Sequence, residues 1–228
     1  MLRKSIISSL DFLGIFACLC KMYNALFPSY IRVFNYHDVP RNEFDNFKLQ
    51  VEYLISHLRP AHPSEIAKCL NGSMPAEPSF ILTFDDGFES HATYVADYLK
   101  SKNITAIFFV PTNAPSVPAE LQAKWALDHN VLKDGETAVI NGRVFGSWHT
   151  WKVVAENHVV ASHTQSHLRF TSAVDFEEAR SQVEGSFKVL EEFLGVTNRI
   201  FCWVGGELTS YSAPVSYTHL TLPTNREV

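Results

Sequence analysis

The stretch ILTFDDGFESH, Ile81 to His91, joins an apolar strand pattern to two adjacent carboxylates and a glycine. The run 80–84 is typical of a strand that is buried on both faces. Asp85 and Asp86 follow it directly, and like charges side by side at the edge of a core are costly. Taken alone, the pattern is also typical of an acidic turn closed by Gly87 at positive φ. Because neighbouring residues of a strand point to opposite faces, one carboxylate can reach a metal ion while the other stands beside it.

Strand and helix patterns alternate along the chain on both sides of this stretch. The clearest helix spans 176–194, where apolar residues repeat at helical spacing and Gly195 provides a C-terminal cap. A long insertion, 111–147, carries Asn141-Gly142 between β-type residues, which predicts a tight hairpin. Further strands are expected at 30–37, 105–110, 159–162 and 199–204, and further helices at 51–58, 64–70 (capped by Ser64), 92–99 and 151–156. The alternation predicts an α/β fold with parallel strands, either an open sheet or a barrel.

A second polar motif follows the strand expected at 159–162. In ASHTQSH, 161–167, His163 and His167 are four residues apart. This spacing lets two imidazoles reach one ion, although two surface histidines are the plain alternative. Sites in parallel α/β folds lie at the C-terminal ends of strands, so both motifs are expected at the same end of the sheet. Two imidazoles and one carboxylate suit a catalytic zinc or related divalent ion, and a second carboxylate is left to handle a proton.

The combination of motifs resembles that of the polysaccharide deacetylases, carbohydrate esterase family 4. The family's T-F-D-D-G motif matches 83–87, and its H-[ST]-x-x-H motif matches 163–167. The stretch FNYHDV, 34–39, is similar to the first strand of a subgroup, and SQVEGSFKVLEEFLG, 181–195, is similar to the helix after the histidine motif. The likeness covers about 30–210. It implies an irregular (β/α) barrel, incomplete at the C-terminus of this chain.

The resemblance also implies an activity and roles for the site residues. The reaction is hydrolysis of an N-acetyl group, less often an O-acetyl group, on an acetylated polysaccharide or oligosaccharide. Asp85 is implied as the catalytic base, and Asp86, His163 and His167 are implied as the ligands of a divalent metal ion, with zinc expected first. Such an ion polarises the acetyl carbonyl and acidifies water, whose proton Asp85 takes.

The chain departs from the family pattern in two places. The third family motif, R-x-P-[YF], falls where the chain reads CWVG, 202–205, so the arginine and the proline are both absent. Gly205 still offers a backbone N–H that could stabilise an oxyanion. The last family motif, Leu-x-His, supplies a general acid, but no match to it occurs before the final segment 214–228, and we assign no role to His219 within that segment. His37, at the end of the first strand, is expected either to face the substrate or to lie in the core.

Other functions stay open beside the deacetylase. A glycan-binding protein of the same fold with damaged chemistry is the main alternative, and the altered third motif motivates it. A non-haem iron oxygenase uses the same ligand set, but the order Asp…His-x-x-x-His differs from its usual His-x-Asp arrangement. The 19 basic and 24 acidic residues give a net charge of -5 without a basic stripe, so no nucleic-acid partner is expected.

The segment 1–29 is set apart from the expected catalytic domain at 30–213. It is basic and then mostly apolar, but Asp11 and Lys21 interrupt it, so no run reaches the roughly 20 apolar residues of a membrane span. An amphipathic helix with peripheral membrane contact, an export signal and an anchor all stay open. The family likeness favours the cell envelope or secretion, and a cytoplasmic location stays open because the four cysteines do not fix the compartment.

The final segment, PVSYTHLTLPTNREV at 214–228, has neither helix nor strand periodicity. It reads as the translation of a transposon sequencing adapter. Segments of this kind are excluded from fold reasoning. We therefore expect the natural sequence to stop being readable near Ala213 and the gene to continue beyond it.

Overall fold

The computed structural model describes residues 22, 26, 29–133, 135–136, 138–171 and 174–205. The expectations for most of 1–29 and for all of 214–228 lie outside the described residues and stay predictions. Within the part of the chain that is described, no helix combines the length and the apolar character needed to cross a membrane.

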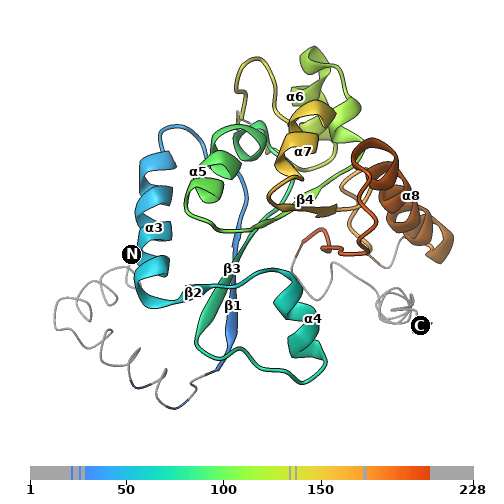
Figure 1. Ribbon diagram of the computed structural model, residues 1–228. Helices are drawn as coiled ribbons and strands as arrows, with labels where there is room; N and C mark the ends of the chain where they lie inside the picture. Colours follow the sequence, from blue (N-terminus) through green and yellow to red (C-terminus); the bar gives the residue numbers. More distant parts are fainter. Residues whose placement is uncertain are drawn as a thin grey trace, which may run out of the picture.

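The centre of the fold is a parallel sheet, as the alternation of strand and helix patterns predicts (Figure 1). Its strands are β1 (Ile31–Tyr36), β2 (Arg59–Pro60), β3 (Ser79–Phe84), β4 (Ile107–Val110) and β5 (Val159–Ser162). The main order is β1-β3-β4-β5, and the short β2 pairs with the start of β3. All six residues of β3 are buried, which confirms the strand buried on both faces. Among the described residues the sheet is open, and β1 forms one of its edges.

Helical segments lie between these strands and after the last of them in the described part of the chain. They are α3 (Phe44–His57), α4 (Ser64–Leu70), the π-helical turn His91–Val95 that continues into α5 (Ala96–Ser101), the 3-10 turn Ala114–Ser116, α6 (Ala119–Asp128), α7 (Trp148–Val154) and α8 (Phe176–Leu194). In Figure 1, α4 lies at the end of the strands opposite α6 and α7.

The main core forms where helices cover one face of the sheet. Alternate strand residues such as Phe80, Leu82 and Phe108 pack there with Val51 of α3 and Trp151 of α7. A smaller cluster covers the other face, with Ile81, Ile107, Phe109 and Ala161 packed against Ala61. A sheet with its helices on one face and a small apolar interior on the other is the arrangement of a barrel wall. The fold is thus α/β, with an incomplete barrel-like sheet.

Three local predictions were wrong or incomplete. Instead of a full strand at 199–204, the chain makes one bridge, between Phe201 and Ser162, because the Asn198 side chain takes up the Val160 carbonyl. Ser64 does not cap α4 with its side chain but stands inside it, as its first residue. The insertion contains a helix, α6, that was not predicted from the sequence. It also contains the predicted hairpin, in which Asn141 and its neighbour glycine both have positive φ.

Candidate metal centre and active site

The two adjacent carboxylates diverge because the chain turns sharply after β3. The N–H of Asp85 still donates to the Tyr36 carbonyl at 2.9 Å, so Asp85 continues the pairing of β3 with β1. Asp86 and Gly87 then take positive φ angles of 73° and 68°. Aspartate tolerates this region better than most residues, and glycine occupies it at no steric cost. The N–H of Gly146, beyond the predicted hairpin, donates to the Gly87 carbonyl at 3.2 Å and braces the turn.

The histidine motif forms a tight loop at the C-terminal end of β5. The N–H groups of Gln165 and Ser166 donate to the side-chain oxygen of Gln182 on α8, at 3.1 and 3.0 Å. Thr164 and His167 lie at φ angles of 67° and 56°, so this loop also contains left-handed positions. The loop is therefore shaped by α8, the helix that the sequence pattern marks most clearly.

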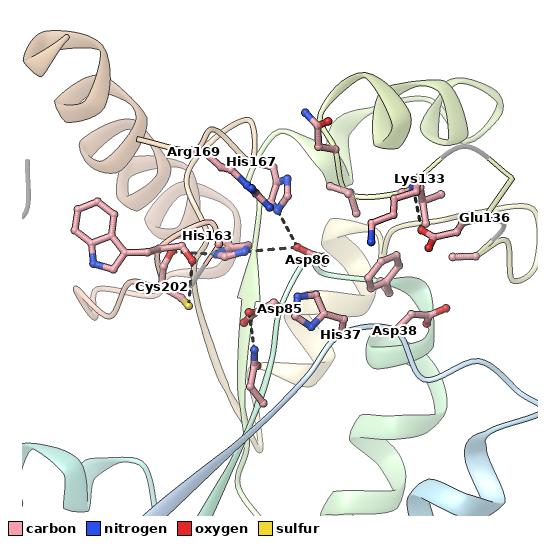
Figure 2. A pocket seen from close by; sticks show the side chains of 18 of the residues that line it. His37, Asp38, Asp85, Asp86, Lys133, Glu136, His163, His167, Arg169 and Cys202 are labelled. Atoms are coloured by element: carbon pink, nitrogen blue, oxygen red, sulfur yellow. Dashed lines mark hydrogen bonds and ion pairs between the residues drawn. The ribbon is translucent and has the colours of Figure 1, made fainter. Parts of the chain in front are cut away.

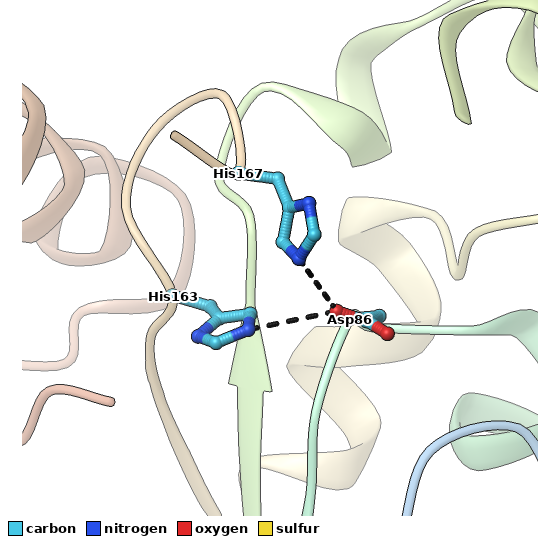
Figure 3. Close-up of side chains that lie close together, drawn as sticks. All are labelled: Asp86, His163 and His167. Carbon is cyan, nitrogen blue, oxygen red and sulfur yellow. Dashed lines mark ion pairs between the residues drawn. The ribbon is translucent and has the colours of Figure 1, made fainter. Parts of the chain in front are cut away.

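Asp86, His163 and His167 converge on one point, as the two motifs predict (Figure 3). Oδ1 of Asp86 lies 3.1 Å from Nε2 of His167 and 3.5 Å from Nε2 of His163. Ligands at the usual zinc distances of about 2.0–2.1 Å in a tetrahedral site are about 3.3 Å apart. The three side chains therefore fit a divalent ion with only small movements, while their role as ligands stays a prediction.

Backbone carbonyls hold both imidazole rings from behind. Nδ1 of His163 bonds the Cys202 carbonyl at 3.0 Å, and Nδ1 of His167 bonds the His129 carbonyl at 2.7 Å. A carbonyl only accepts, so each Nδ1 carries a hydrogen, and in the neutral form of each ring the lone pair of Nε2 faces Asp86. Metal-ligating histidines are oriented in this way by their outer partners. Oδ1 of Asp86 is buried without a hydrogen-bond partner, which also suits a metal ligand.

The charges of the three side chains depend on one another. Burial alone would raise the pKa of Asp86, but its close contacts and charge interactions with both histidines outweigh this and hold the pKa well below the ordinary value. Burial disfavours the charged form of His163, but contacts with Asp86 and the Cys202 carbonyl raise its pKa well above the ordinary value. Without a metal ion, Asp86 and His163 thus each favour the charged form of the other. A divalent cation would replace the proton of His163.

Asp85 stands apart from this cluster, and the two carboxylates point in different directions (Figure 2). Its Oδ2 accepts a hydrogen bond from Nδ2 of Asn35 at 2.9 Å, and its Oδ1 is buried without a partner. The residue is 6% exposed and lines the same cavity as Asp86. A carboxylate held beside a metal centre, with one oxygen free of hydrogen bonds, is placed to accept a proton.

A cavity of about 1040 Å³ opens over the centre. His37 is exposed and lines it, so the core alternative for His37 was wrong, and its contact with a substrate stays a prediction. Gly205 also lines the cavity, at a φ of 81°. The insertion supplies one wall. The residues that line this wall are Asn130, Val131, Leu132, Lys133, Glu136 and Ala138.

The sequence reading missed several residues that support the site. The carbonyls of His129 and Cys202 leave no mark in the sequence, because any residue type can supply a backbone oxygen. Gln182 looked like an ordinary polar position on an amphipathic helix. Asn35 carried a usable signal, because it is a polar residue on a strand and shares a face with His37 two positions later.

Known proteins were compared with the chain by sequence and by structure. The family model described as polysaccharide deacetylase matches residues 73–219, well over half of the chain. A search of curated proteins gave no significant match. Thirteen solved chains match significantly by structure.

Three of these structures cover most of the fold. The deacetylase PplD of Streptococcus pyogenes, in complex with acetate, is 17% identical with a TM-score of 0.63, over 86% of this chain and 81% of that one. IcaB of Ammonifex degensii is 22% identical with a TM-score of 0.59, over 84% and 81%. The deacetylase domain of BpsB from Bordetella bronchiseptica is 19% identical with a TM-score of 0.59, over 83% and 85%.

At these identities the structures show a shared fold, and the sequence match to the family model carries the assignment. The matched range includes the carboxylate turn and the histidine loop that meet in the structure. The chain belongs to the polysaccharide deacetylase family.

Proposed function

We propose that this protein is a zinc-dependent hydrolase that removes N-acetyl groups, or less often O-acetyl groups, from a polysaccharide or oligosaccharide. The convergence of Asp86, His163 and His167 within 4.8 Å of one another, on the floor of the cavity, carries the proposal. One carboxylate and two neutral imidazoles are a common catalytic zinc set, which leaves a position open for water or substrate. Family membership supplies the reaction class.

A bound zinc ion would polarise the acetyl carbonyl and lower the pKa of water at the open position. Groups of the protein itself hold the ion, orient the ligands and transfer the proton. Asp86 and both histidines hold the ion, and the carbonyls behind the rings keep each Nε2 aimed at it. Asp85, next to this centre but turned away from it, accepts the proton of the attacking water through its free oxygen, and this proton is then passed to the amine as the C–N bond breaks.

The remaining groups bind the substrate and stabilise charge. The N–H of Gly205, at the cavity wall, is proposed to donate to the oxyanion that forms when water attacks the acetyl carbonyl. His37 is proposed to contact the sugar, since its ring is exposed on the cavity side of β1. The size of the cavity suits more than the acetyl group alone, in keeping with a sugar chain.

We propose the cell envelope or the medium as the site of action, which fractionation of cells would test.

Acetate release from acetylated chito-oligosaccharides tests the proposal. The zinc-loaded chain should release acetate and leave free amines on the sugar, and acetylated xylan should separate N-acetyl from O-acetyl preference. Asp85→Asn serves as the matched control, because it keeps the shape of the side chain and removes the base.

A glycan-binding role without chemistry is the second candidate, and Cys202 at the place of the family's arginine is the observation that favours it. In that case the wild-type chain and Asp85→Asn would bind the oligosaccharides equally, and neither would release acetate. Such a result would overturn the deacetylase proposal.

A further inference from the structure

Asn35 of β1 contacts Asp85, which follows the neighbouring strand β3. The proposed function assigns no role to this contact. Nδ2 of Asn35 donates to Oδ2 of Asp85 at 2.9 Å. The two residues are fifty positions apart in the sequence. The register of β1 and β3 brings them together, because Asn35 pairs with Thr83 and Asp85 follows two residues later on the same face.

The orientation of the Asn35 amide is itself fixed. The hydroxyl of Thr83 donates to Oδ1 of Asn35 at 2.9 Å. Because the Thr83 hydroxyl donates to Oδ1, the NH₂ group is the part of the amide that faces Asp85. Thr83 is buried, with 6% exposure, whereas Asn35 is exposed toward the cavity, so the Thr83 end of this bond is shielded from water. A chain of two hydrogen bonds therefore runs from Thr83 through Asn35 to the carboxylate.

The orientation of the Asp85 carboxylate matters because the metal ligands lie close to it. Asp85 is the direct neighbour of Asp86, and its charge is near enough to His163 to affect that ring. A freely turning carboxylate in this place could turn toward the cation site and become a further ligand. The Asn35 bond ties Oδ2 to β1 and leaves Oδ1 as the oxygen without a hydrogen-bond partner.

We propose that Asn35, locked by Thr83, is a positioning residue that holds Asp85 off the metal centre with one oxygen free to take a proton. The expected effect of this inference on turnover rests on the proposed function. The hydrogen bonds that carry it do not depend on that function. A bond from a neutral donor to an ionised carboxylate is among the stronger hydrogen bonds in proteins, so its loss should be measurable.

Steady-state kinetics of the zinc-loaded full chain test the inference. Asn35→Ala should lower kcat by about 10-fold to 100-fold, the range expected for one bond to a charged group, and change KM little. Zinc content should stay at the wild-type level. Asn35→Asp keeps the size of the side chain and loses the donor, so it should lower kcat similarly. This second variant decides the question if the alanine variant does not fold.

The role of Thr83 predicts a non-additive result. Thr83→Val alone should lower kcat by a smaller factor, and the double variant with Asn35→Ala should be no slower than Asn35→Ala alone, because both changes break one chain of bonds. The matched control is Val33→Ala, since Val33 is exposed on the same face of β1 and should leave kcat unchanged. Equal kcat values in Asn35→Ala, Asn35→Asp and Val33→Ala would overturn the inference, and so would strictly additive losses in the double variant.

Crystal structures separate this inference from the proposed function. If the wild-type chain releases no acetate, the proposed function fails, and the structures of the wild type and Asn35→Ala decide the role of Asn35. The inference expects the Asp85 carboxylate to turn or lose its single orientation in the variant, while Asp86 and the histidines stay in place. An Asp85 side chain that keeps its wild-type orientation without Asn35 would overturn it.

Discussion

Protonation of His91 should destabilise the protein as the pH falls toward 4. The ring is fully buried, and its neighbours are the aromatic rings of Phe84, Phe88 and Phe108, at centroid distances of 5.2, 5.6 and 5.9 Å. Nε2 bonds the His37 carbonyl at 2.7 Å, and Nδ1 is buried without a partner. The stable form is therefore the neutral ring with its hydrogen on Nε2, since a second proton would place an unpaired charge inside the core.

The size of the effect follows from the difference between the folded and unfolded pKa values. Burial lowers the pKa of His91 from 6.5 to about 4, against smaller opposing effects of the His37 hydrogen bond and the charge of Asp86. Between these values the unfolded chain binds a proton that the folded chain does not, so stability falls as the pH falls. A difference of about 2.5 between the pKa values corresponds to about 3 kcal/mol, lost between pH 6.5 and 4.

Urea unfolding across this pH range, with a chelator present, measures the loss. His91→Gln is the matched variant, because its amide can still donate to the His37 carbonyl but does not titrate. It should lose about 3 kcal/mol less than the wild type over the same range. Groups that titrate in both proteins, such as Asp86 and His163, cancel in the difference. Equal losses in the two proteins would show that the burial of His91 does not govern its protonation.

Four other substitutions, one of them a control, test separate parts of the structure. Asp85→Asn should keep bound zinc and lower turnover by about 10² to 10⁴-fold, as the loss of a general base does, whereas loss of zinc with retained turnover would contradict its assigned role. Gly87→Ala should weaken zinc binding and destabilise the fold, because φ is +68° and the added Cβ would lie 3.0 Å from Val110. Gly72→Ala, at φ +87° with nothing near its Cβ, should carry only the backbone cost, and equal zinc affinity in the two glycine variants would argue against the strained turn. Asp175→Ala should lower the free energy of unfolding by about 1 kcal/mol through loss of the α8 cap, and an unchanged thermal midpoint would refute this.

The sequence predicts the parts of this fold that depend on local pattern. The continuous apolar run before Asp85 gave β3, and the apolar repeat with Gly195 gave α8 with its left-handed C-terminal residue. The Asn141-Gly142 pair gave the hairpin. In each case the signal lies within a few residues of the chain, and tertiary contacts do not override it.

The elements that depend on distant contacts were harder to predict. The strand expected near Phe201 is reduced to one bridge with Ser162, because the side chain of Asn198 intervenes. α6 lies in the insertion and exposes two of its large apolar residues, Leu121 and Leu127. Its Gln122 is fully buried, because its side-chain oxygen accepts from the N–H groups of Val144 and Phe145. A polar residue that is buried for the sake of such bonds breaks the helical pattern in the sequence.

The site shows the same division. The spacing of His163 and His167 and the adjacency of the aspartates predict which residue types meet, and the structure brings them together. The carbonyls that orient the rings belong to residues far away in the chain and leave no sequence signal. Asn35 lies between these cases, because its polar character is visible in the sequence but its partner is not.

Titration of zinc into the metal-free protein, with acetate release as the readout, tests the central claim most directly. Acetate release from acetylated chito-oligosaccharides should be absent after chelation and should rise with added zinc until one ion is bound per chain. Asp86→Ala should abolish both the tight binding and the activity, because the structure centres both histidines on that carboxylate. Acetate release that is unaffected by chelation, or tight zinc binding that survives Asp86→Ala, would contradict the account.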